Sequence, residues 1–418
     1  MSAAGRDARA TTWVVVVLIT LVQSVAACAN VTLPTVAPKL AATLGIDASW
    51  IGYQVSLLFG MAVVSATFGG GLVARLGPAR TAQASASLCV AGMLLAALPH
   101  LAATLVATIL CGLALGMINP GAAQVIVRFT PLRHRNLIFS LKQSGVPAGG
   151  VLVGLTAPAI AVTAGWQWSV LPAIVVAVAA IVLMQWVHPL WDDQRNARAP
   201  LLGTRSGGIG AVWRRPALRW LALSGFWFAF IQRCVLTFLV SYLYLVAGWS
   251  LVQAGVLLAI YQGTGGFTRP LWGVVADRTA GPPVLIGLTL TTIATCLALF
   301  WLDASWPPWL ATLVVTLLGA TSFGWNGVYH GEATRLAPPK QIALITAGTS
   351  SFAYAGVLVG PALFALGYQL SGSYPLMFGS LALAATFGLV CLLLALRAAR
   401  EPPAHDRADA HDRADARD

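Results

Sequence analysis

Apolar stretches of about 20 residues recur along almost the whole chain, and this recurrence limits the folds open to it. A helix of that length crosses the hydrocarbon core of a bilayer. Only 9% of the 418 residues are charged, whereas soluble domains carry about 25%. We therefore predict an all-α polytopic membrane protein with twelve transmembrane helices. The predicted spans are 13–36, 50–72, 81–99, 102–127, 137–164, 170–187, 220–246, 253–275, 283–302, 308–329, 342–366 and 376–396.

The basic residues predict the orientation of these spans. The first span is too long for a signal-peptide core and no clear cleavage site follows it, so we expect it to be retained. With the N-terminus inside, Lys39 is the one residue among the 25 Lys and Arg that falls in an outside loop. This positive-inside bias predicts cytoplasmic N- and C-termini in a cell (inner) membrane. The net charge of +12 then reflects topology, and we expect the lipid bilayer rather than nucleic acid as the partner.

Polar segments divide the chain into two groups of six spans. The stretch 188–219 is rich in Gly, Pro and Arg and is predicted to be a cytoplasmic linker. It separates an N-terminal bundle, 13–187, from a C-terminal bundle, 220–396. Residues 1–12 form a predicted cytoplasmic N-terminus. The end of the chain, 397–418, repeats the hexapeptide AHDRAD and is predicted to be a disordered cytoplasmic tail.

The two halves carry an internal repeat. A shift of 203 residues superposes Arg75 on Arg278, a shift of 207 superposes Asn119 on Asn326, and a shift of 206 superposes one GVLVG, at 150–154, on another at 356–360. Two six-helix halves in the same orientation form a parallel repeat. We therefore predict two pseudo-symmetric six-helix bundles, with a substrate site near the midplane between them.

The loop after the eighth span supports a family resemblance. GVVADR, at 273–278, resembles the loop motif of the major facilitator superfamily. The counterpart after the second span, GGLVARLG, keeps Arg75 but has Ala74 where the family usually has aspartate. The resemblance covers all twelve spans and implies secondary transport by alternating access by a monomer. It also implies that the third, sixth, ninth and twelfth spans face lipid, and none of these spans contains Asp, Glu, Lys or Arg.

Arg269 lies inside the eighth span, about 12 Å from its end at Asp277 at 1.5 Å per residue. A charge near the bilayer centre costs from ~3 to more than ~10 kcal/mol, so such a residue is a functional candidate. Arginine followed by proline here resembles the pattern of monocarboxylate, oxalate and nitrate porters, in which this arginine contacts the anion. Guanidinium presents a planar fork to carboxylate. The alternative is a structural arginine bonded to helix carbonyls or to a distant acid.

Arg233 and Lys142 are two further cations within predicted spans. The repeat places Arg233 opposite Asn30, and no carboxylate lies at a comparable depth in the first nine spans. Arg233 is either a co-ligand, a gate or a structural residue. Lys142 begins KQSGVPAGG, which resembles the fifth span of cyanate-transporter-like members. It is shallow enough to reach the membrane surface, which is the simpler interpretation. The glycines favour close helix contact.

The tenth span ends in WNGVYHGEATRLAP. Its Glu332 and Arg335 are predicted to form an inner latch with Asp277 and Arg278, and Arg75 is the candidate gating residue of the N-terminal half. His330 is deeper and titrates near neutral pH when unperturbed, so it is a candidate proton carrier, although a hydrogen-bonded histidine is the simpler alternative. The remaining candidates for polar lining of the substrate site are Asn30, Tyr261, Gln262 and Asn326.

The leading hypothesis is a secondary transporter for a small organic or inorganic anion, above all a carboxylate, with proton symport as an option. Drug efflux is the alternative, but the Gly-Pro-x-x-Gly-Gly signature of drug exporters is not matched and the first six spans lack a buried carboxylate. A membrane enzyme is disfavoured, because the sequence shows no P-loop, metal-ligand cluster or nucleophile–base pair. We therefore predict no cofactor and no metal. The sequence leaves the substrate, the direction of transport and the coupling ion open.

Overall fold

The computed structural model describes residues 3–130, 135–201, 208–338 and 341–400, which form helices joined by short connections. The first half contains α1 Ala3–Thr35, α2 Ala37–Leu44, η1 Ala48–Trp50, α3 Ile51–Leu76, α4 Pro78–Ala96, α5 Leu101–Phe129, α6 Arg135–Gln143, α7 Gly145–Thr163, η3 Trp166–Val170 and α8 Leu171–Trp191. The second contains α9 Gly208–Trp213, α10 Pro216–Leu245, α11 Leu251–Thr279, α12 Gly281–Phe300, α13 Pro308–Ser322, α14 Trp325–Leu336, α15 Ile342–Ser371 and α16 Tyr374–Arg400.

The predicted all-α fold with twelve spans is confirmed. Ten helical segments among the described residues are long and apolar enough to cross a membrane. The third and eighth predicted spans are helices α4 and α11 of comparable length, and their polar side chains account for the lower hydropathy. Two predicted spans are interrupted. The fifth consists of α6 and α7 with a break at Ser144, and the tenth consists of α13 and α14 with a break at Phe323 and Gly324.

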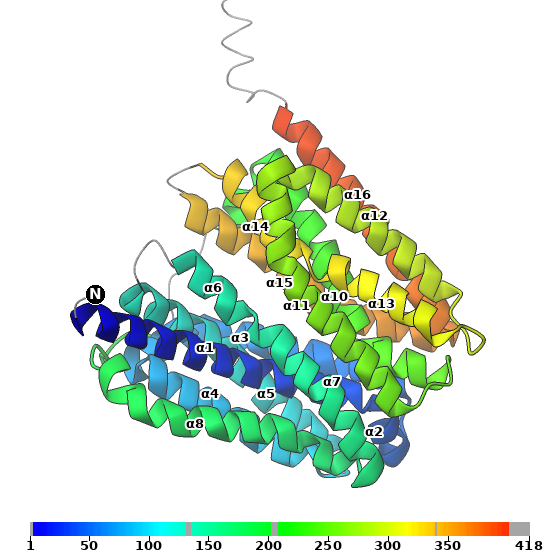
Figure 1. Ribbon diagram of the computed structural model, residues 1–418, viewed down its shortest axis with the longest axis horizontal. Helices are drawn as coiled ribbons and strands as arrows, with labels where there is room; N and C mark the ends of the chain where they lie inside the picture. The colour runs from blue at the N-terminus through cyan, green and yellow to red at the C-terminus, as the bar shows by residue number, and fades with distance from the viewer. Residues whose placement is uncertain (1–2, 131–134, 202–207, 339–340, 401–418) are drawn as a thin grey trace, which may run out of the picture.

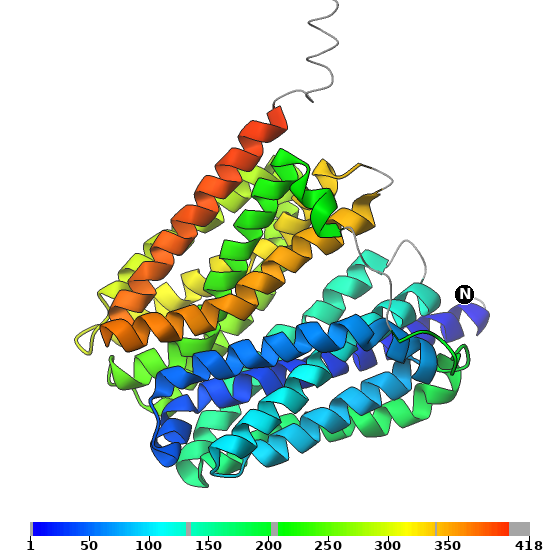
Figure 2. The same cartoon turned by 180° about the vertical axis from the view of Figure 1, so that it is seen from behind.

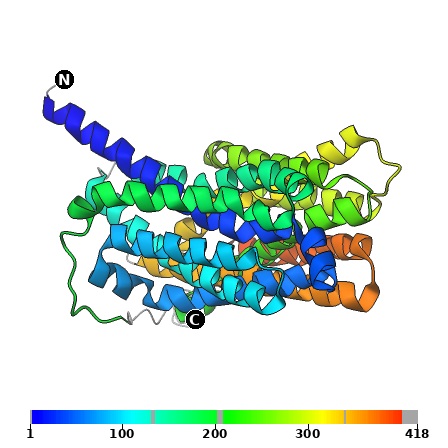
Figure 3. The same ribbon diagram turned by 90° about the horizontal axis from the view of Figure 1, so that it is seen from below.

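Each half is a bundle, and the two bundles lie side by side (Figure 1). Between the halves, α7 packs on α11, α3 packs on α15, and α1 packs on α10. We call the end where α3 and α11 finish, at Leu76 and Thr279, the basic end, and the end where they begin, at Ile51 and Leu251, the far end. The ribbons of the halves meet near the far end and diverge toward the basic end, as Figures 1 and 2 both show. Seen from below, α1 continues beyond the bundle at its N-terminal end (Figure 3).

Helices α4, α8, α12 and α16 have their main packing partners within their own half. They expose large apolar side chains, among them Trp186 at 77% and Leu383 at 65%, as expected of surfaces covered by lipid tails. Their polar groups are paired near the basic end, where Gln83 donates to Gln185 and both accept from Arg80. These are the helices that the resemblance predicted to face lipid.

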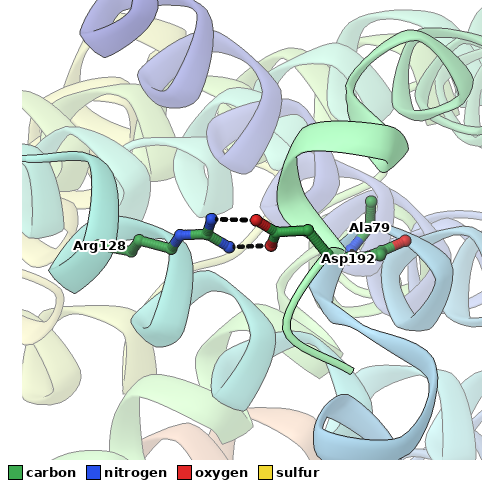
Figure 4. A network of polar contacts seen from close by, with 4 residues as sticks. Ala79, Arg128 and Asp192 are labelled. Atoms are coloured by element: carbon green, nitrogen blue, oxygen red, sulfur yellow. Dashed lines mark hydrogen bonds and ion pairs between the residues drawn. The ribbon is translucent and has the colours of Figure 1, made fainter. Parts of the chain in front are cut away.

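Two carboxylates after α8 hold the basic end of the first half together (Figure 4). Asp192 accepts the backbone N–H groups of Ala79 at 2.8 Å and Arg80 at 3.1 Å, in the first turn of α4. Asp193 forms a bidentate ion pair with Arg128 at the end of α5. Burial raises the pKa of Asp192, whereas the hydrogen bond from Arg128 lowers the pKa of Asp193. The first carboxylate satisfies helix N–H groups that have no intrahelical partner.

Asp192→Ala should lower the stability of the protein by about 1 kcal/mol, because the first turn of α4 loses its side-chain acceptor. Thermal unfolding in detergent, followed by circular dichroism, measures the change. Asp193→Ala is the matched control: its carboxylate is exposed and its ion pair is screened by solvent, so its melting temperature should change less. Equal effects of the two substitutions would contradict the capping role of Asp192.

Candidate functional site

Arg269 lies against the break in the tenth span. Because α13 ends at Ser322 and α14 begins at Trp325, the backbone at Phe323 leaves the helical pattern. Arg269 donates from Nε to the Phe323 carbonyl at 3.1 Å, and its guanidinium carbon lies 4.3 Å from the centre of the Phe323 ring. This contact fixes the side chain through one edge and one face of the guanidinium. The two terminal nitrogens have no hydrogen-bond partner among the described residues.

Tyr261 and Gln262, about two turns before Arg269 on the same helix α11, are fully buried. The hydroxyl of Tyr261 shares a 2.9 Å hydrogen bond with Ser322 on α13, and its ring packs edge-on against Phe323. Tyr261 thus braces the same break from within the second half and lies within electrostatic range of Arg233 and Arg269. Gln262 instead points at the first half, where its amide abuts Gly150 of α7. Both amide heteroatoms are buried without a partner.

Arg233 and Asn30 meet where the halves join. Arg233 on α10 is 7% exposed and donates to the side-chain oxygen of Asn30 on α1 at 3.0 Å. Its guanidinium carbon lies 4.3 Å from the centre of the Phe59 ring on α3. The two residues are 203 positions apart, which is the repeat shift, so they are pseudo-symmetric counterparts that touch each other. Such a pair lies beside the pseudo-twofold axis, at the centre of the molecule.

Lys142 at the end of α6 is buried, with 4% of its surface exposed. Its ammonium donates to the side-chain oxygen of Asn119 on α5 at 2.6 Å. In the second half, Asn326 on α14 donates weakly to Gln232 on α10 at 3.4 Å, and Gln232 also accepts from the Trp325 indole at 3.0 Å. Asn119 and Asn326 are repeat counterparts, so each half holds an asparagine beside a polar partner.

His330 lies one turn beyond Asn326 on α14. Its ring packs against Tyr329, and its Nδ1 atom is buried without a hydrogen-bond partner. It lies on α14, which packs on α11, the helix of Arg269, and Gly327 of α14 approaches the Arg269 backbone. The histidine is therefore close to the cation of the neighbouring helix but not bonded to it.

The five predicted gating residues separate into two places. Glu332 and Arg335 form an ion pair at 2.7 Å on α14, and Arg75 donates to the Ala199 carbonyl of the segment after α8 at 2.6 Å. Asp277 and Arg278 are exposed at the end of α11, and no ion pair is found for either within the described ranges. Asp277, Glu332 and Arg335 line a cleft of about 750 Å³ at the basic end of the second half.

The contact between α7 and α11, which we call the seam, joins the halves toward the far end. Glycines line it: a Cβ atom built on Gly154 would lie 2.8 Å from the Gly255 carbonyl oxygen, and one on Gly266 would lie 2.7 Å from Pro147. Gly150 leaves room for the amide of Gln262. Small residues therefore allow the two backbones to approach closely.

In the second half, the residues around the break are Arg269, Tyr261, His330 and Asn326. Arg233 and Asn30 meet at the axis between the halves. Lys142 lies in the first half, apart from both groups. Sequence reasoning missed four contributors, which are Asn119, Gln232, Phe59 and Phe323. The repeat paired Asn119 with Asn326, but Asn119 was not selected as a site residue. Nothing in the sequence marks Phe323 as the place where the helix breaks.

Comparison with known proteins points to one family. The family model described as "Major Facilitator Superfamily" matches residues 19–347. A protein of Mycobacterium tuberculosis strain H37Rv, described as an uncharacterized MFS-type transporter, is 24% identical over 278 residues. That match covers 63% of this chain and 60% of the relative. The chain therefore aligns with less than two thirds of the relative's length.

Solved structures share the fold at low identity. A peptide transporter in complex with sulfate has a TM-score of 0.72 at 16% identity, covering 92% of this chain and 95% of its own. A D-xylose–proton symporter has a TM-score of 0.69 at 14% identity, with coverages of 92% and 96%. An inward-facing bacterial homologue of the lysosomal transporter Spinster has a TM-score of 0.69 at 14% identity, with coverages of 94% and 99%.

Gly154→Ala should separate the halves at the far end, because the new methyl group would meet the backbone of α11. Tyr53 and Gln369 are hydrogen-bonded at 3.1 Å across the halves, so cysteines at these two positions can report closure with a short bifunctional cross-linker. The six native cysteines are replaced first. We expect the cross-linked fraction to fall at least twofold.

Gly263→Ala is the matched control for this experiment. A Cβ atom there would lie 3.5 Å from Val151, at an ordinary contact distance, and the cross-linked fraction should stay at its original value. An unchanged fraction in Gly154→Ala would contradict the role of the seam in holding the halves together.

Proposed function

Because the chain belongs to the major facilitator superfamily and is a multi-pass membrane transporter, we propose that it moves a small anion, above all a carboxylate, by alternating access. One observation supports the anion most strongly. Lys142 and Arg233 lie in helical segments apolar enough to cross a membrane, and Arg269 lies in α11, the eighth predicted span. The ion pairs found among the described residues involve none of the three. Neutral dipoles are their partners. A bound anion would supply the missing negative charge.

The chemistry of Arg269 suits this role. Its Nε atom and one face are engaged by Phe323, so the two terminal nitrogens remain for a ligand. A guanidinium edge matches the two oxygens of a carboxylate and forms charge-assisted hydrogen bonds with it. Hydrogen bonds to charged groups contribute about 1.5–3 kcal/mol each, which is enough for selective binding. Asn326 and Gln232 offer further polar contacts on adjacent helices.

The divergence of the halves gives the site its access. The halves pack along the seam toward the far end and separate toward the basic end (Figure 1). With the basic end in the cytoplasm, as the positive-inside bias predicts, the site would open to the cytoplasm of a bacterial-type inner membrane. Arg233, bonded to Asn30 at the axis, would lie on the closed side and act as a gate as well as a source of positive potential.

Proton coupling would follow from the nearness of His330 to Arg269. A second positive charge beside Arg269 is unfavourable, and an anion bound to Arg269 removes most of that penalty. Binding of the anion would then raise the affinity for the proton, and binding of the proton would raise the affinity for the anion. The other charged groups on this stretch, Glu332 and Arg335, pair with each other, so Arg269 is the charge that acts on the histidine from outside its own helix.

Arg269→Ala and Arg269→Lys should each lower the uptake of radiolabelled carboxylates into proteoliposomes by more than about tenfold, because neither variant retains the guanidinium fork. Arg397→Ala, at an exposed position near the end of α16, is the control and should transport normally. Transport of hydrophobic cations in place of anions, or normal anion uptake by Arg269→Ala, would reject the proposal and favour drug efflux.

His330→Gln should abolish the stimulation of anion uptake by an imposed pH gradient, because glutamine keeps hydrogen-bonding capacity but carries no titratable proton. Anion exchange at equal pH on both sides should be retained. Uptake with and without the gradient, measured on the same vesicles, gives the ratio. A ratio equal to that of the unmodified protein would show that His330 is a hydrogen-bonding residue and not the proton carrier.

A further inference from the structure

Lys142, which is buried, and Arg269, which is half-buried, lie on opposite halves, close to the point where the halves separate. Within the seam, the contact nearest the basic end that involves a glycine is Pro147 against Gly266. Arg269 follows Gly266 by three residues, or about 4.5 Å along the helix axis. Lys142 precedes Pro147 by five residues, or about 7.5 Å at helical rise, with the break at Ser144 between them. Both side chains therefore begin at a similar depth, one on each wall.

The position of α6 indicates that Lys142 lies on the side of the first half that faces the second half. Helix α6 packs on α1, α5 and α7, and Figure 1 shows it on the rim that faces the second half. The side chain is 4% exposed, and its ammonium bonds to Asn119, whose own side chain is exposed. The Asn119 amide is neutral, so the charge of Lys142 has no negative partner. Two of the three N–H groups of the ammonium remain for a ligand.

Arg233 is less suited to be the second ligand on this surface. Asn30 occupies one end of its guanidinium, and Phe59 covers one face. Its Nε atom is buried without a partner, which places the group inside the closed contact between the halves. Lys142 and Arg269, by contrast, lie on the side where the helices part.

We propose, resting on the proposed function, that the substrate carries two anionic groups, one bound by Arg269 of the second half and the other by Lys142 of the first. Without such a ligand, each cation has only neutral partners, which are Asn119 for Lys142 and Phe323 for Arg269. A dianion cancels both charges and links the halves. A monoanion cancels one charge and leaves the other unpaired during closure.

The test is a binding series on purified protein in detergent, measured by isothermal titration at constant pH and ionic strength. The ligands are acetate and propionate as monoanions, and malonate, succinate and glutarate as dianions of increasing length. For the unmodified protein we expect at least one dicarboxylate to bind ten or more times as tightly as both monocarboxylates. Equal affinities for the two classes would overturn the inference while leaving anion transport intact.

Variants of Lys142 test whether this residue binds the second anionic group. Lys142→Gln should reduce the ratio of dicarboxylate to monocarboxylate affinity to near one and keep monocarboxylate binding, which also demonstrates that the variant is folded. Lys142→Arg should retain part of the ratio. Lys39→Gln, at an exposed position on α2, is the control and should keep the full ratio. An unchanged ratio in Lys142→Gln would overturn the inference, and the absence of binding for all five anions would overturn the proposed function as well.

Discussion

The cost of holding positive charge among apolar helices governs the centre of this molecule. A cation there needs oriented dipoles around it, since water is excluded and an isolated charge is expensive. The fold supplies the Asn30 amide and the Phe59 ring for Arg233, the Phe323 carbonyl and ring for Arg269, and the Asn119 amide for Lys142. Each partner stabilises a charge without cancelling it. The charges are therefore stabilised but not neutralised, which is what the proposed anion site requires.

The break in the tenth span gives Arg269 a backbone hydrogen-bond partner. In a continuous helix the carbonyl of residue 323 would accept an N–H four residues later, and it would have less capacity for a side chain. Interrupting the helix at Phe323 turns the carbonyl outward to Arg269. Irregular backbone inside a membrane is tolerated where other protein groups satisfy it. Here the arginine and the broken helix satisfy each other.

The repeat relates the backbones of the two halves, but the charged residues of the site are not repeated from one half to the other. By the shift of 203, the counterpart of Arg269 is Ala66, and α5 runs unbroken from Leu101 to Phe129 where the second half has α13 and α14. The caps differ as well, because Asp192 bonds the start of α4 whereas Glu332, from within α14, lies against Gly281 at the start of α12. A pseudo-symmetric scaffold thus carries an asymmetric site.

The sequence by itself determined the membrane class, the twelve spans, the two-half repeat and the depth of Arg269, Arg233 and Lys142, because hydrophobicity and spacing along a helix are local properties. Contacts between helices are not local, and only the tertiary structure decided them. The repeat placed Arg233 opposite Asn30 but did not predict their hydrogen bond. Nothing in the sequence indicated that Arg269 would face the Phe323 carbonyl or that Gln262 would fit against Gly150. Such pairs depend on helix rotation and on where a helix breaks, and packing sets both of these across segments far apart in the chain.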